Sequence, residues 1–134
     1  MAVVLDSGAV IGFLDRRDAL HEAADASIRE LVRESPLTVS AVTYAEVLTG
    51  VRLGHHAEEA VKGFFTDLIS AVHSVDVAVA DRAAELRAAS KALRMPDALI
   101  LATAETVPEV ELLVTGDAGM ARAPGIGCAV RLLR

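Results

Sequence analysis

The chain begins with an uninterrupted apolar run, Ala2–Leu5, that ends at an acid, Asp6. A strand with one face in water alternates apolar and polar residues, whereas a strand covered on both faces is apolar throughout. Strands buried on both faces, as in parallel sheets covered by helices, have such continuous apolar runs. This run therefore predicts a central strand of a sheet that is covered on both faces.

The rest of the chain alternates between short apolar runs and segments with helical periodicity. Further strands are expected at Leu37–Val39, Ala71–Val75, Glu111–Thr115 and Cys128–Leu132, giving a mainly parallel sheet of four to five strands. Helices are expected over residues 10–14, 24–32, 40–53, 61–69, 76–93 and 96–104. This alternation predicts a three-layer α/β/α sandwich that forms one domain, residues 1–134.

Composition excludes several classes of protein. A single cysteine, Cys128, cannot form an internal disulfide or a cysteine-rich zinc site. The 19 acidic and 13 basic residues give a formal charge of −6, which disfavours binding of duplexes through a broad basic surface. No apolar run approaches the roughly 18 residues of a membrane span, and Ala2–Leu5 is too short for a signal-peptide core. A soluble, cytoplasmic protein is expected.

Four acids are expected to meet at one edge of the sheet. Asp6 and Asp117 follow predicted strands, Glu46 lies near the start of a predicted helix, and Asp97 lies in the first turn of the helix that Pro96 opens. Ligands of open parallel sheets bind beyond the carboxyl ends of the strands. The positions of these acids therefore predict a cluster of carboxylates at that edge.

Each acid also has an ordinary structural explanation. Asp6 is a favourable N-cap residue, and Thr43 and Glu46 have the spacing of a capping box. Asp97 suits the positive end of a helix, and Asp117 suits a glycine-containing turn. Only the combination of all four acids favours a functional site.

Carboxylates held close together repel one another, so they require a counter-ion or raised pKa values. Mg²⁺ binds oxygen ligands and commonly combines one or two carboxylates with waters and substrate phosphates. Zinc is the poorer candidate, because the chain has one cysteine and no cluster of histidines. The acids therefore favour a magnesium site that promotes the hydrolysis of a phosphodiester.

Four segments, Val3–Ser7, Val39–Gly50, Met95–Ile100 and Val114–Asp117, resemble the motifs of PIN-domain ribonucleases. More narrowly, they resemble the VapC toxins of bacterial type II toxin–antitoxin systems, over essentially the whole chain and in the family's order. The resemblance implies a Mg²⁺- or Mn²⁺-dependent endoribonuclease that cuts structured RNA such as tRNA or rRNA. It also implies a homodimer and neutralisation by a cognate VapB-like antitoxin.

The resemblance assigns the metal-binding and catalytic quartet, and the two hydroxyls that accompany it, to Asp6, Glu46, Asp97, Asp117, Ser7 and Thr115. Two positions depart from the family pattern. Gly8 stands where the family often has Asn or Ser, and residues 118–120 lack the further acid and aromatic residue that often follow the last motif. These departures leave the second metal position open and do not affect the four principal acids.

Two other functions compete with this interpretation. In the first, the chain is a noncatalytic PIN-fold module that binds RNA or protein, and its acids only cap helices. In the second, Asp6 is a phosphoacceptor, but such a site would require a second acid where the chain has Gly8.

Basic side chains are the candidates for phosphate contact in a bound RNA, and they are Arg16, Arg17, Arg52, Lys91, Arg94 and Arg122. With one Tyr, three Phe and no Trp, recognition by RNA shape is favoured over base stacking.

Overall fold

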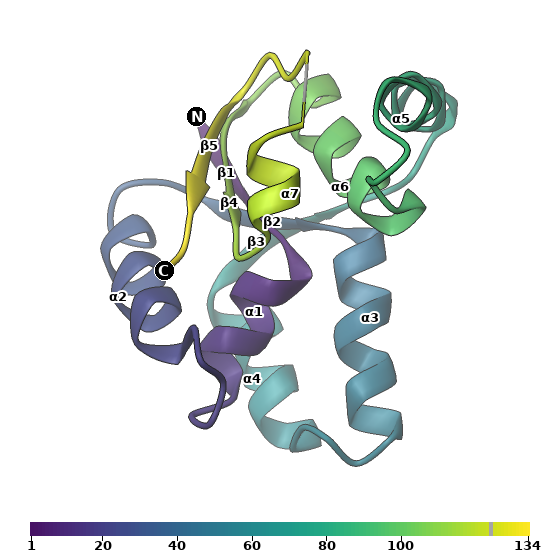
Figure 1. Ribbon diagram of the computed structural model, residues 1–134. Helices are drawn as coiled ribbons and strands as arrows, with labels where there is room; N and C mark the ends of the chain where they lie inside the picture. The colour runs from purple at the N-terminus through teal and green to yellow at the C-terminus, as the bar shows by residue number, and fades with distance from the viewer. Residues whose placement is uncertain (124) are drawn as a thin grey trace.

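A five-stranded sheet forms the centre of the computed structural model, which describes residues 1–123 and 125–134 (Figure 1). The strands are β1 (Ala2–Leu5), β2 (Leu37–Ser40), β3 (Ile69–His73), β4 (Val110–Thr115) and β5 (Ala129–Leu132). Their order across the sheet is β3-β2-β1-β4-β5, and every neighbouring pair is parallel. The predicted parallel α/β fold is confirmed.

Helices cover both faces of this sheet. They are α1 (Ser7–Leu14), α2 (His21–Leu31), α3 (Ala41–Arg52), α4 (Glu58–Asp67), α5 (Val77–Ala89), α6 (Met95–Thr106) and α7 (Ala118–Ala121). One face packs mainly against α1 to α4 and the other against α5 to α7 (Figure 1). The three-layer sandwich is therefore confirmed, and none of the described helices is long and apolar enough to cross a membrane.

Strand β1 is apolar throughout because both of its faces are buried. Ala2 and Val4 pack with the apolar side chains of α5 and α6, whereas Val3 and Leu5 pack with those of α1, α2 and α4. All four residues are buried because alternate side chains of a strand point to opposite faces. Asp6 is thus held at the edge of the sheet by a strand anchored in both halves of the core.

Two boundaries near β3 are wrong in the sequence prediction. Helix α4 ends at Asp67, so Ile69 lies in the strand rather than in the helical stripe. Strand β3 ends at His73, whereas the prediction placed this strand at Ala71–Val75. Ile69 pairs with Leu37 of β2, and this pairing decides the start of the strand. Apolar periodicity cannot separate the end of a helix from the start of an adjacent strand.

Helix α5 begins as predicted and ends earlier. Asp76 caps it, and its Oδ1 accepts a hydrogen bond from the backbone N–H of Val79 at 2.9 Å. The helix ends at Ala89, so Leu93 lies in the connection to α6 instead of in the helix. Leu93 is nevertheless buried in the core that α5 and α6 share. Its hydrophobicity reflects burial rather than helical periodicity.

Candidate functional site

Asp6 combines a capping role with a place in the site. It follows β1 and is the N-cap of α1, where its Oδ1 accepts a hydrogen bond from the backbone N–H of Ala9 at 2.7 Å. Its Oδ2 accepts a hydrogen bond from Thr115 Oγ1 at 2.5 Å. The residue is only 3% exposed. The capping explanation is therefore correct, but it accounts for only one of the two carboxylate oxygens.

Burial raises the pKa of the Asp6 carboxyl above its ordinary value, because the charged form loses contact with water. Hydrogen bonds from Thr115 and from the backbone of Ala9 and Gly116 oppose this shift, and the negative charge of Asp97 adds to it. The net result is a pKa above the ordinary value, so ionisation of Asp6 costs more free energy here than in water. A positive charge placed close to the carboxylate would reduce that cost.

Thr115 joins Asp6 to Asp117. Its hydroxyl donates to Asp6 and accepts a hydrogen bond from the backbone N–H of Asp117 at 2.9 Å. Asp117 in turn caps α7, a single helical turn where the sequence indicated only a turn-like loop. Its Oδ1 accepts a hydrogen bond from the backbone N–H of Gly119 at 2.7 Å. The exits of the adjacent strands β1 and β4 are thus linked through one buried hydroxyl.

Glu46 does not form the predicted capping box with Thr43. Helix α3 begins directly after Ser40, whose side chain accepts a hydrogen bond from the backbone N–H of Val42 at 3.1 Å. Because Ser40 already caps the helix, Glu46 lies in its second turn and is not needed at the start. Its Oε1 accepts a hydrogen bond from Ser7 Oγ at 2.5 Å, and Ser7 Oγ also lies 3.3 Å from Thr43 Oγ1.

Asp97 lies in the first turn of α6, directly after Pro96, as the sequence indicated. It is buried, and its Oδ2 accepts a hydrogen bond from Nε of Arg94 at 3.2 Å. Arg94 was one of six candidates for phosphate contact, and nothing in the sequence analysis placed it beside an acid. Its spacing of three residues from Asp97, at the start of a helix, is the signal that could have identified the pair.

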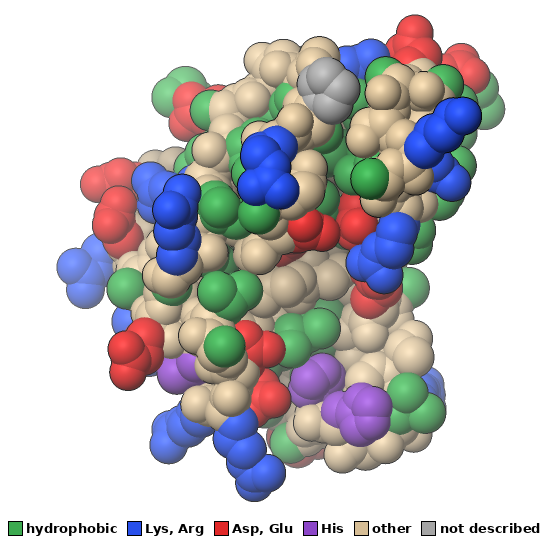
Figure 2. All heavy atoms as spheres, viewed as in Figure 1, with side chains coloured by type: hydrophobic (Ala, Val, Ile, Leu, Met, Phe, Trp, Pro, Cys, Tyr) green, Lys and Arg blue, Asp and Glu red, His purple; other side chains and the backbone are tan. Residues whose placement is uncertain are grey.

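One cavity of about 220 Å³ brings these groups together. It is lined by Asp6, Ser7, Gly8, Leu20, Glu46, Arg94, Asp97, Ile100, Gly116, Asp117 and Met120. All four predicted acids and Ser7 therefore line one cavity, and Thr115 lies behind Asp6. On the face that Figure 2 shows, acidic side chains gather near the middle, with basic side chains beside them.

Leu20 is a wall of this cavity that the sequence analysis missed. It lies in the connection between α1 and α2, immediately before His21. A Cβ atom added at Gly116 would overlap the Leu20 side chain, so the glycine allows Leu20 to lie across the end of β4. An isolated leucine in a connecting segment gives no signal in one sequence, because its role depends on this close approach.

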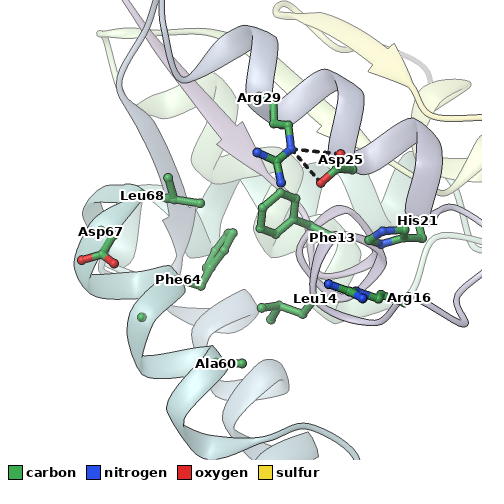
Figure 3. A pocket seen from close by; sticks show the side chains of 11 residues that line it. Phe13, Leu14, Arg16, His21, Asp25, Arg29, Ala60, Phe64, Asp67 and Leu68 are labelled. Atoms are coloured by element: carbon green, nitrogen blue, oxygen red, sulfur yellow. Dashed lines mark hydrogen bonds and ion pairs between the residues drawn. The ribbon is translucent and has the colours of Figure 1, made fainter.

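A larger cavity lies elsewhere, between α1, α2 and α4 (Figure 3). It has a volume of about 620 Å³, and its lining includes Phe13, Phe64 and an ion pair between Arg29 and Asp25. None of the four predicted acids lines it. We place the candidate site in the smaller cavity because the buried acid with the raised pKa and the convergent carboxylates are found there.

The donor set of the smaller cavity fits a hard divalent cation. Within residues 1–123 and 125–134, no three His, Cys, Asp or Glu side chains are grouped closely enough to hold a metal ion by themselves. The carboxylates are instead held by hydroxyl, backbone and guanidinium donors. Mg²⁺ does not require a complete protein cage, since it retains several waters and binds one or two carboxylates. Four carboxylates line the cavity, and no thiolate or imidazole is among the described residues that line it, which matches that preference.

Several solved structures share this fold. VapBC2 from Rickettsia felis, bound to promoter DNA, has 16% identity and a TM-score of 0.78, over 100% of both chains. VapC20 from Mycobacterium tuberculosis, a sarcin-ricin loop cleaving toxin, has 16% identity and a TM-score of 0.74, over 91% of this chain and 95% of that chain. A toxin–antitoxin complex from Klebsiella pneumoniae has 24% identity and a TM-score of 0.72, over 96% and 95%.

The sequence comparisons agree with the structural ones at the level of the family. Comparison with curated protein sequences gives no significant match. A family model described as the PIN domain, however, matches residues 3–126, which include all four acids of the cavity. The matched region also extends from β1 through α7. The chain therefore belongs to the PIN domain family.

Proposed function

We propose that the protein is a metal-dependent endoribonuclease toxin of the VapC type, with residues 1–134 acting as one PIN domain. The observation that carries the proposal is the convergence of four carboxylates, from four separate elements, on one 220 Å³ cavity. Like charges are brought together there, and one of them, Asp6, is buried with a raised pKa. This arrangement is unfavourable for folding alone and suits a site that receives a cation.

In this proposal Asp6, Asp97 and Asp117 hold Mg²⁺ or Mn²⁺, with Glu46 completing the set of acids. The bound ion would supply positive charge against the nonbridging phosphate oxygens and lower the pKa of water. Thr115 fixes Asp6 through its 2.5 Å hydrogen bond, and Ser7 fixes Glu46 in the same way. Both hydroxyls therefore keep carboxylates in place, so that little reorganisation is needed when substrate arrives.

The proposed reaction consumes one water for each bond cut. The water oxygen forms a bond to phosphorus, and the bond from phosphorus to the 3′ oxygen breaks. The water gives up a proton, for which Glu46 is an exposed carboxylate acceptor in the set, and the leaving 3′ oxygen gains one. The products are a 5′-phosphate and a 3′-hydroxyl.

The proposed substrate is structured RNA such as tRNA or rRNA. One structurally similar protein, VapC20, is described as a toxin that cleaves the sarcin-ricin loop. Other similar structures are toxin–antitoxin complexes, which supports a VapB-like antitoxin as partner. We also propose that the chain acts as a homodimer in the cytoplasm. Its few aromatic residues favour recognition of RNA by shape.

The test is cleavage of structured RNA by the purified protein, free of antitoxin, in Mg²⁺ or Mn²⁺. We expect cleavage by the wild type and a loss of about 100-fold or more in Asp6→Asn, because a metal ligand is removed. Asp67→Asn is the matched control, since Asp67 lines the larger cavity and lies outside the acid cluster. Cleavage no faster in the wild type than in Asp6→Asn would refute the proposal.

The noncatalytic PIN module remains the alternative, because Asp6 and Asp117 do cap helices. The two functions differ in their response to metal. A metal site stabilises the native state when millimolar Mn²⁺ is added, because the ion binds the folded form preferentially. Helix caps alone would give no such response, so a Tm unchanged by Mn²⁺ would favour the noncatalytic module.

A further inference from the structure

Arg94 lies at the rim of the acidic cavity, where it brings a positive charge to the carboxylates. Among the described residues that line the cavity, it is the only Lys or Arg. Its Nε donates to Asp97 Oδ2 at 3.2 Å, yet the Arg94 side chain is 73% exposed, whereas that of Asp97 is 12% exposed. The guanidinium therefore connects a buried acid to the solvent from which a substrate would arrive.

The charge of Arg94 acts on more than its immediate partner. The pKa of its guanidinium is raised first by the hydrogen bond to Asp97 and then by the charge of that acid, with smaller contributions from Glu46 and Asp117. Arg94 is therefore within electrostatic reach of three of the four acids. The surface pair of Arg29 with Asp25, along one face of α2, lines a cavity in which the other charged groups are one acid, Asp67, and one further Arg, Arg16.

Charge balance shows what the cavity needs from Arg94. Four ionised carboxylates with one divalent cation leave two net negative charges, and these would repel a phosphodiester. Arg94 reduces that excess to one. Like charges a few ångströms apart repel more strongly in a partly desolvated cavity than in water, so this single positive charge bears directly on the approach of phosphate.

The hydrogen bonds of Arg94 leave donors available. Within the described part of the chain, its only side-chain hydrogen bond is the one from Nε to Asp97. Its two Nη groups carry further N–H donors, and a guanidinium binds phosphate oxygens through two parallel hydrogen bonds. Arg94 is also attached at the N-terminus of α6, a helix of 12 residues. The positive end of that helix favours an anion at the same place.

We propose that Arg94 is a substrate-binding catalytic residue that changes partner during the reaction. It pairs with Asp97 while the cavity holds no cation, and it donates its Nη groups to the nonbridging oxygens of the scissile phosphate when cation and RNA are bound. The inference rests on the proposed nuclease function. It has a second consequence, because a guanidinium paired with Asp97 competes with a cation for the same carboxylate.

These two roles predict effects of opposite sign in Arg94→Gln. Loss of the competing positive charge tightens Mn²⁺ binding several-fold, measured from free Mn²⁺ by electron paramagnetic resonance. Loss of the phosphate contact slows single-turnover RNA cleavage by roughly 10- to 100-fold, the effect of one charge-assisted hydrogen bond. Arg94→Lys keeps the charge without the planar fork, so it retains near wild-type Mn²⁺ affinity and recovers only part of the cleavage rate.

Arg29→Gln is the matched control. Arg29 is 70% exposed in its side chain and donates to an acid four residues away, but it lies outside the acidic cavity. We expect wild-type Mn²⁺ affinity and cleavage from this variant.

Three results would overturn the inference. Cleavage by Arg94→Gln at the wild-type rate would show that Arg94 does not contact the scissile phosphate. Weaker Mn²⁺ binding together with slower cleavage, in both Arg94 variants, would mean that Arg94 only positions Asp97. Absence of cleavage by the wild type would refute both the proposed nuclease function and this inference. The first two results would refute only the inference.

Discussion

Asp6 and Asp117 follow the adjacent parallel strands β1 and β4, and each caps the helix that comes next. Their surroundings differ. Asp117 is exposed, whereas Asp6 is 3% exposed and has a raised pKa caused mainly by burial. Capping does not require burial, because an exposed Asp caps a helix equally well. Capping therefore does not account for the burial of the Asp6 carboxylate, whereas the proposed metal site would.

The largest expected effect is the stabilisation of the protein by metal, which tests the comparison between Asp6 and Asp117 directly. Saturating Mn²⁺ raises the free energy of unfolding by about 2.7 kcal/mol when its concentration is 100 times Kd. We expect Asp6→Asn to lose most of this stabilisation and Asp117→Asn to lose a smaller part, because Asp6 is the more buried ligand. Thermal unfolding with Mn²⁺ and then with excess EDTA measures both. Equal losses of Mn²⁺ stabilisation in the two variants would contradict the distinction between the buried Asp6 and the exposed Asp117.

Thr115→Val breaks the link between the two acids. The substitution keeps the shape of the buried side chain and removes the hydroxyl that donates to Asp6 and accepts from the backbone of Asp117. Leaving buried polar groups without a partner lowers the free energy of unfolding by about 1–3 kcal/mol. Urea unfolding in EDTA measures the change. A variant as stable as the wild type would show that the hydroxyl is not needed to hold Asp6.

Asp6→Asn and Asp117→Asn should change metal-free stability in different ways. Asn caps helices about as well as Asp, so both variants keep the cap. Asp6→Asn also removes an unfavourably buried charge, and we expect its Tm in EDTA to rise by a few degrees at pH 7. Asp117→Asn should leave the Tm within about a degree of the wild type, because an exposed substitution that keeps its cap changes stability little. A lower Tm for Asp6→Asn would mean that its hydrogen bonds outweigh the effect of burial.

The smallest expected effect is the pH dependence of the difference in Tm between Asp6→Asn and the wild type. This dependence tests whether burial of the Asp6 charge causes the difference. A raised pKa in the folded state means that Asp6 contributes stability below its ordinary pKa of 3.8 and loses that contribution as pH rises through the folded-state pKa. The Tm advantage of Asp6→Asn over the wild type should therefore be largest near pH 7 and shrink as pH falls toward 4. A constant difference across this range would exclude desolvation of the carboxylate as its origin.

Sequence patterns predicted the fold better than they predicted element boundaries. The apolar run Ala2–Leu5 correctly indicated a central strand, because burial on both faces leaves no place for a polar residue. The capping box at Thr43 was wrong because Ser40, at the end of β2, already caps the helix. Ile69 was wrongly placed in a helix because its strand depends on pairing with Leu37, which lies far away in the sequence. Local patterns do not contain such pairings.

The sequence by itself determined the parallel α/β architecture, the residue types of the site and the edge of the sheet at which the acids would lie. These follow from hydrophobic periodicity and from the rule that parallel strands end at one edge. Only the tertiary structure decided which acid is buried, that Ser7 holds Glu46 and that Arg94 faces the acids. Burial, hydrogen bonding and pKa depend on distances between residues that are remote in the chain, and those distances exist only after the layers have packed.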